Sequence, residues 1–253
     1  MSPAIIGLIV FACTFGGALV GMRLRAVLPD HHLSEETRET VKAGIGLIAT
    51  MTALVLGIVT GSAKNTFDAM DSAVKTVSAD LIALDRALLR YGPEATGLRE
   101  ALKKGVTERM EQIWPAHQLY PRVPDLSAKP AGIELLGGQI QRLEPKTQEQ
   151  RALQARAVEL AETLMQMRWL IFENMRTSVP VPFLVILCFW LTVTFASFGL
   201  FSPRNATVNA ALFLSAVSVA GAVFLVLEMN GPFEGLIRVS SDPIRYALEH
   251  MGQ

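Results

Sequence analysis

Four long runs of apolar residues divide the chain. A helix of about 20 apolar residues is long enough to cross the roughly 30 Å hydrocarbon layer of a membrane. Basic residues border the first two runs, with Arg23 after the first and Lys42 and Lys64 on either side of the second. The pattern predicts a multi-pass protein of the cell membrane with four transmembrane helices, at residues 3–22, 43–63, 178–201 and 206–229.

The first run could be mistaken for a secretory signal peptide. A signal peptide carries basic residues before its apolar stretch and ends at a small-residue cleavage site. No basic residue precedes the run that begins at Pro3, and no such site leads into a soluble segment after it. We therefore interpret the first run as a retained membrane span.

The residues between the second and third spans have a helical pattern. From Phe67 to Leu88, apolar residues recur every three or four positions, which is the spacing of one helix face. No breaker separates this stretch from the second span, so one long helix is expected to run out of the membrane and end at Tyr91-Gly92-Pro93. Further helices are expected at about residues 94–114, at 131–143 and after 147, with a proline-rich connector at 115–130.

The order of these elements predicts an all-α integral membrane protein. The third and fourth spans are separated only by residues 202–205, and the first two by the polar stretch from Arg23 to Lys42, so the spans should form two hairpins. A short amphipathic helix from Ile244 to Met251 is expected to lie on the membrane or to dock on a neighbour. The predicted domains are hairpin 1 at 1–63, an extramembrane helical bundle at 64–177, hairpin 2 at 178–229 and a tail at 230–253.

Composition and charge agree with a membrane protein and argue against a nucleic-acid partner. Charged residues make up 18% of the chain, against about 25% in ordinary soluble domains, and apolar residues make up 51%. The 23 basic and 23 acidic residues cancel. Because nucleic-acid binding needs a basic excess on one face, we expect no nucleic-acid partner.

Residues that could carry catalysis or hold a metal are scattered. The sequence has no glycine-rich phosphate loop, no serine elbow and no histidine pair at metal-ligand spacing. His31 and His32 are adjacent and point to different faces, and Cys13 and Cys188 lie inside apolar runs, far in sequence from any histidine or carboxylate. We expect no enzymatic activity, no catalytic residue, no metal site and no cofactor.

The second span carries a stripe of small and hydroxyl-bearing side chains that ends at a lysine. Its members step by four or three positions and so lie on one helix face. Two interpretations are open: small side chains let helices pack closely in lipid, and in a ring of identical subunits the same stripe would line a narrow pore whose lysines attract anions. The stripe consists of Gly46, Thr50, Ala53, Gly57, Thr60 and Lys64, and Phe67 extends it.

One carboxylate directly follows a long apolar run. Glu228 lies at the end of the fourth span, before the helix-breaking Asn230-Gly231-Pro232. Ionisable groups at membrane depth are costly and often functional, which makes Glu228 a candidate for an ion or gating role. The alternative is a solvated acid at the end of a helix.

Two features together resemble the bestrophin-like domain family of bacterial and plant membrane proteins. One is the second span that continues into a long helix, and the other is the tail from Glu228 to Val239. The most specific part of the tail is the motif formed by Pro232, Phe233 and Gly235.

The resemblance implies a distant relation to bestrophins, which are pentameric anion channels whose second span lines the pore. It therefore implies a homo-oligomer, a pentamer by analogy, that conducts small ions across the lipid bilayer. Gly57, Thr60, Lys64 and Phe67 would lie at or near the pore constriction. The alternative function is a non-conducting membrane scaffold that binds a partner through its helical segment.

The distribution of basic residues predicts the orientation in the membrane. Lysines and arginines near short loops mark the cytoplasmic side. One side holds five of them, and the other, which has the long helical segment, holds Arg238 and Arg245; the five are Arg23, Arg25, Arg38, Lys42 and Arg204. The rule places both termini and the helical segment outside the cytoplasm. Bestrophins have the opposite arrangement, and our prediction follows the charges.

Overall fold

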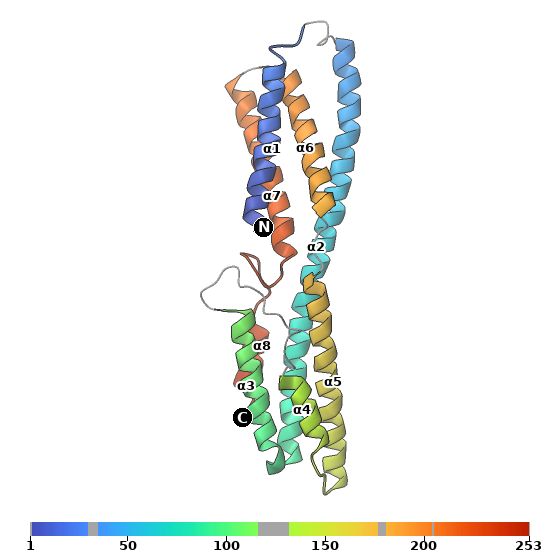
Figure 1. Ribbon diagram of the computed structural model, residues 1–253, viewed down its shortest axis with the longest axis vertical. Helices are drawn as coiled ribbons and strands as arrows, with labels where there is room; N and C mark the ends of the chain where they lie inside the picture. Colours follow the sequence, from blue (N-terminus) through green and yellow to red (C-terminus); the bar gives the residue numbers. More distant parts are fainter. Residues whose placement is uncertain (1, 30–34, 116–131, 177–180, 204, 253) are drawn as a thin grey trace. The chain divides into compact units, whose positions relative to one another are not determined.

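A computed structural model describes residues 2–29, 35–115, 132–176, 181–203 and 205–252. Every element in these ranges is helical, as predicted, and Figure 1 labels the α-helices. The elements are α1 (Pro3–Leu24), α2 (Glu35–Tyr91), the 3-10 helix η2 (Pro93–Ala95), α3 (Thr96–Ile113), α4 (Gly132–Gln141), α5 (Gln148–Arg176), α6 (Val181–Phe201), α7 (Ala206–Met229) and α8 (Asp242–His250).

Four of these helices are long and apolar enough to cross a membrane, namely α1, α2, α6 and α7. These four candidate membrane helices coincide with the four predicted spans. The fourth has the predicted bounds, and the first extends two residues beyond the predicted 3–22. The third begins at Val181, and Pro182 fits there because a proline in the first helical turn loses no backbone hydrogen bond.

Helix α2 is a single uninterrupted helix of 57 residues, as the unbroken pattern predicted. It ends at Tyr91 because Gly92 adopts a φ of +126°, a left-handed backbone conformation that favours glycine, and Pro93 then begins η2. The chain divides into two compact units, and α2 contributes to both. Unit 1 comprises Met1–Asn65 and Ser178–Asn230, and unit 2 comprises Thr66–Thr177 and Gly231–Gln253.

In unit 1, α1 packs against both α6 and α7. Glycines make the α1–α6 approach close: a Cβ atom on Gly21 would overlap the backbone of Ala196, and one on Gly199 would overlap the carbonyl of Ala18. Two apolar clusters fill this unit, and Leu56 of α2 packs against one of them. The loop after α1 is tied to the end of α6, because the Arg25 guanidinium donates to the Ser202 carbonyl.

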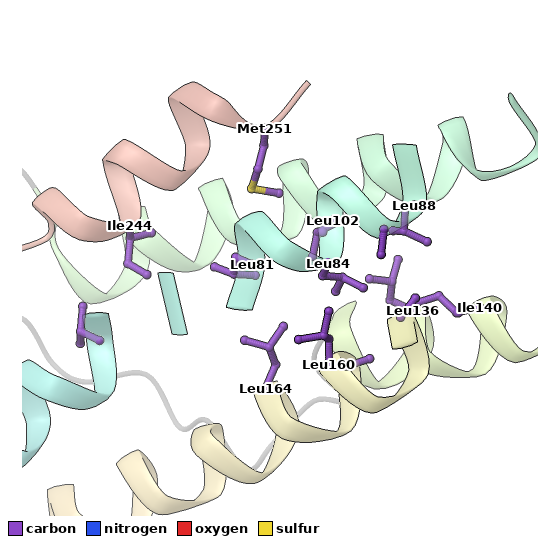
Figure 2. Packing of buried hydrophobic residues seen from close by; sticks show 14 of the residues in the cluster. Leu81, Leu84, Leu88, Leu102, Leu136, Ile140, Leu160, Leu164, Ile244 and Met251 are labelled. Atoms are coloured by element: carbon purple, nitrogen blue, oxygen red, sulfur yellow. The ribbon is translucent and has the colours of Figure 1, made fainter. Parts of the chain in front are cut away.

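Unit 2 has one hydrophobic core built from five segments (Figure 2). The predicted apolar face of α2 supplies its centre, with Leu81, Leu84 and Leu88. The surrounding helices add one or two large side chains each. These are Leu102 from α3, Leu136 and Ile140 from α4, Leu160 and Leu164 from α5, and Ile244 and Met251 from the C-terminal segment.

The C-terminal helix α8 belongs to this core, which corrects the expectation that it lies on the membrane or docks on a neighbour. Its apolar residues Ile244 and Ala247 are buried. Hydrogen bonds fix both ends of the segment: the Ser78 hydroxyl donates to the Pro243 carbonyl, and Lys103 Nζ donates to the Met251 carbonyl at 2.7 Å. The amphipathic pattern was correctly identified, but its apolar face is covered by the leucines of the same chain.

Candidate functional site

The portion of α2 in unit 1 presents three different faces. The first is the predicted stripe, and all six of its members up to Lys64 are exposed in the single chain. Around Gly46 and Gly57 there is open space, because an added Cβ atom would meet no other atom within 4 Å. No described part of the same chain therefore covers the stripe.

The second face is a ridge of large apolar side chains, rotated by about one residue from the stripe. Its members Leu47, Met51, Leu54 and Ile58 are all exposed. The third face contains the buried residues Thr52 and Ala63. The large apolar side chains of the ridge, which could contact lipid or another subunit, therefore lie on a different face of α2 from the small side chains of the stripe. The sequence contained this signal, since the ridge also steps by four and three.

The two threonines of the stripe hold their hydroxyl protons within the helix. Thr50 Oγ1 donates to the Gly46 carbonyl at 2.8 Å, and Thr60 Oγ1 donates to the Leu56 carbonyl at 2.7 Å. The exposed part of each hydroxyl is therefore its oxygen, which accepts hydrogen bonds. While the two hydroxyls keep these bonds, their protons are not directed outward. Among the six stripe side chains, Lys64 then has the only hydrogen-bond donor that is not used in one of these two bonds.

Phe67, the predicted extension of the stripe, has a different environment. It lies in unit 2, where it is partly buried and packs against the leucine core. An aromatic ring held in this way has less freedom to project from α2 than the exposed residues before it. The candidate lining that is exposed in unit 1 therefore ends at Lys64.

Glu228 is buried in the last turn of α7, with 1% of its surface exposed. This burial does not agree with the alternative of a solvated acid at the end of a helix. Glu228 takes part in an interaction within the described chain. A buried carboxyl at the end of a span is a costly feature, which keeps it a candidate for a functional role.

The tail motif forms a tight turn that anchors to α3. The Val239 amide donates to the Pro232 carbonyl at 2.8 Å and closes the turn. Phe233 is buried and packs edge-on against Trp114, with ring centroids 5.5 Å apart, and the Trp114 indole donates to the Val239 carbonyl at 2.9 Å. Burial also raises the pKa of the Glu234 carboxyl above its ordinary value.

The third motif residue, Gly235, has a φ of +80°, where a side chain strains the backbone. Gly235→Ala should therefore lower the stability of the protein by about 1–2 kcal/mol. Gly105→Ala is the matched control, because Gly105 lies within α3 with no atom near its Cβ position and should gain about 0.5–1 kcal/mol. Thermal unfolding followed by circular dichroism measures both. Equal midpoints for the two variants would contradict a conformational role for Gly235.

Unit 2 also contains a buried ion pair that sequence reasoning missed. Arg99 of α3 contacts Asp85 of α2 through two hydrogen bonds of 2.9 Å, and the Gly252 amide approaches the same carboxylate at 3.4 Å. The pairing raises the pKa of Arg99 above its ordinary value. No group of three or more His, Cys, Asp or Glu side chains that could hold a metal occurs in the described ranges.

Taken together, the spans and the helical unit define the class of a multi-pass, all-helical membrane protein. The family model of the bestrophin-like domain matches residues 11–244 of the chain, and the protein belongs to this family. The match covers the stripe, Glu228 and the tail motif. Comparison with curated proteins gave no match. Comparison with solved structures gave none either.

Proposed function

We propose that the protein is a homo-oligomeric ion channel whose pore is lined by α2, and that it favours anions. The observation that carries the proposal is the exposed stripe of small and hydroxyl-bearing residues on a membrane span, set apart from the large apolar ridge beside it. Membership of the bestrophin-like family supports the same function.

Electrostatics favour Lys64 as the residue that selects for anions. The hydroxyls of Thr50 and Thr60 donate to their own helix, so the surface that they present to an ion carries partial negative charge. Glycine and alanine add space but no charge. A ring of Lys64 side chains at the end of the stripe would supply the positive potential that attracts anions into the pore.

The wider architecture belongs to the same proposal. The four spans would form two hairpins in the lipid bilayer of the cell membrane, unit 2 would lie outside it as the inserted bundle, and the subunits would form a ring, a pentamer by family analogy. Basic residues near the short loops favour a non-cytoplasmic unit 2. No catalytic step and no cofactor enters the proposal.

Anion flux from liposomes tests conduction. The purified full-length protein, reconstituted in vesicles loaded with chloride, should release chloride when a potential drives it, while empty vesicles retain it. Flux of neither chloride nor potassium would contradict the proposal, and so would a flux that stays unchanged when Thr60 and Lys64 are both substituted. That result would favour the alternative, a non-conducting scaffold that binds a partner through unit 2. Exposure of the stripe in the single chain does not favour this alternative, because a scaffold has no need of an uncovered small-residue face.

Lys64→Glu should reverse the selectivity of the channel. At about 10 Å and an effective dielectric constant of about 20, the change from a positive to a negative side chain alters the energy of an ion by about 3 kcal/mol. This corresponds to at least a roughly hundredfold change in the anion-to-cation permeability ratio. The reversal potential in a salt gradient should change sign. Thr60→Val is the control: it removes a hydroxyl that already bonds to its own helix, and the sign should stay the same. A change of sign with Thr60→Val, or none with Lys64→Glu, would assign selectivity to other residues.

A further inference from the structure

The two cysteines of the chain, which are far apart in sequence, meet in unit 1. Cys13 lies near the middle of α1 and Cys188 lies in the first half of α6. Both are free thiols and both are partly buried. Their side chains interact.

The register of the two helices gives independent support for this pairing. A Cβ atom on Gly21 of α1 would meet Ala196 of α6, and one on Gly17 would meet the Thr192 carbonyl at 2.9 Å. From the first pair to the second, the residue numbers on both helices decrease by four. The two helices α1 and α6 therefore run parallel. One further turn back on the same two faces reaches Cys13 and Cys188.

The close crossing of α1 and α6 favours a disulfide between these two faces. A disulfide needs Cα atoms about 4.4–6.8 Å apart, which is less than the usual distance between helices with large side chains at their contact. The glycines at 17, 21 and 199 remove that obstacle along the α1–α6 crossing.

We propose that Cys13 and Cys188 form a redox-active dithiol within the membrane, oxidised to a disulfide by a lipid-soluble quinone. Both S–H bonds break, one S–S bond forms between the two cysteines, and the two electrons and two protons pass to the quinone, which leaves as a quinol. The oxidant is assigned to this class because the pair lies within two membrane spans, where water-soluble thiols and disulfides have no access. The product ties α1 covalently to α6.

Counting alkylated thiols tests the proposal on the full-length protein in liposomes. The vesicles are treated with decylubiquinone, and the protein is then denatured, alkylated with a maleimide and weighed by mass spectrometry. Untreated protein should carry two labels and quinone-treated protein none, and dithiothreitol should restore both. The linked peptide pair should appear in a digest of the oxidised protein.

Single and relocated cysteines provide the controls. Cys13→Ala and Cys188→Ala should each keep their one remaining thiol after treatment with the quinone. The double variant Ala12→Cys/Cys13→Ala keeps two cysteines but moves one to an exposed position of α1, and it should keep both labels. Two labels on treated wild-type protein would overturn the proposal, as would equal loss in the relocated variant. Oxidation by copper phenanthroline alone, without reaction with the quinone, would overturn the assignment of a quinone as the oxidant.

Discussion

Gly21→Ala and Gly199→Ala should each disrupt unit 1 although they add only one methyl group. In both cases the new Cβ atom would overlap backbone of the facing helix, and backbone cannot move aside as a flexible side chain can. Overpacking of this kind costs about 1–3 kcal/mol and sometimes more, and we expect about 3 kcal/mol here. For a protein of this size the unfolding midpoint should fall by roughly 10 °C.

Gly16→Ala is the matched control for these variants. It makes the same chemical change on the same helix, at a position where an added Cβ atom meets nothing within 4 Å. Thermal unfolding in detergent, combined with size-exclusion chromatography, measures stability and assembly together. If Gly16→Ala and Gly21→Ala behaved alike, the close α1–α6 crossing would be wrong.

Asp85→Ala should produce the second large effect, this time in unit 2. The side chains of Asp85 and Arg99 are 2% and 15% exposed, so removal of the carboxylate leaves a guanidinium largely buried without its partner. Breaking a buried ion pair in this way costs about 3–5 kcal/mol. The carboxylate also accepts from the Gly252 amide, so the C-terminal segment should loosen as well.

Asp71→Ala provides the comparison, because Asp71 and Lys75 form an exposed ion pair on the same helix. Exposed pairs contribute about 0–1 kcal/mol, so this variant should unfold close to the wild-type temperature. The double variant Asp85→Leu/Arg99→Met, which replaces both charges, should recover most of the lost stability. A single Asp85→Ala variant as stable as Asp71→Ala would show that the buried pair does not hold α2 and α3 together.

Local patterns in the sequence predicted much of this fold. The span from Ala206 to Met229 and the end of α2 at Tyr91 follow from apolar length and from breakers close by in the chain. The tail motif was also recognisable in the sequence, and the structure gives its physical basis: Phe233 packs on Trp114, and Gly235 has a positive φ. The predicted proline-rich connector lies almost wholly outside the described residues, and His31 and His32 lie outside them as well.

Features that depend on pairing between distant segments were not predictable in the same way. Asp85 and Arg99 are charged residues on two helices, and nothing in their spacing indicates that they meet. The pairing of Cys13 with Cys188 depends on the register of α1 against α6. The spacing of Gly17 and Gly21, a small residue every four positions, was a usable signal for the close crossing. For α8 the amphipathic pattern indicated a buried face but not which surface would cover it.

Cysteine modification during current recording tests the central claim most directly. Thr60→Cys and Ile58→Cys are introduced separately into a Cys13→Ala/Cys188→Ala background that conducts like the wild type, and each protein is recorded in planar bilayers. Thr60 lies on the stripe, whereas Ile58 lies on the apolar ridge and is 63% exposed in the single chain. If α2 lines the pore through the stripe, a charged, water-soluble methanethiosulfonate should reduce the current through Thr60→Cys channels and leave Ile58→Cys channels unchanged. Current that responds at Ile58 and not at Thr60, or a protein that carries no current at all, would contradict the account.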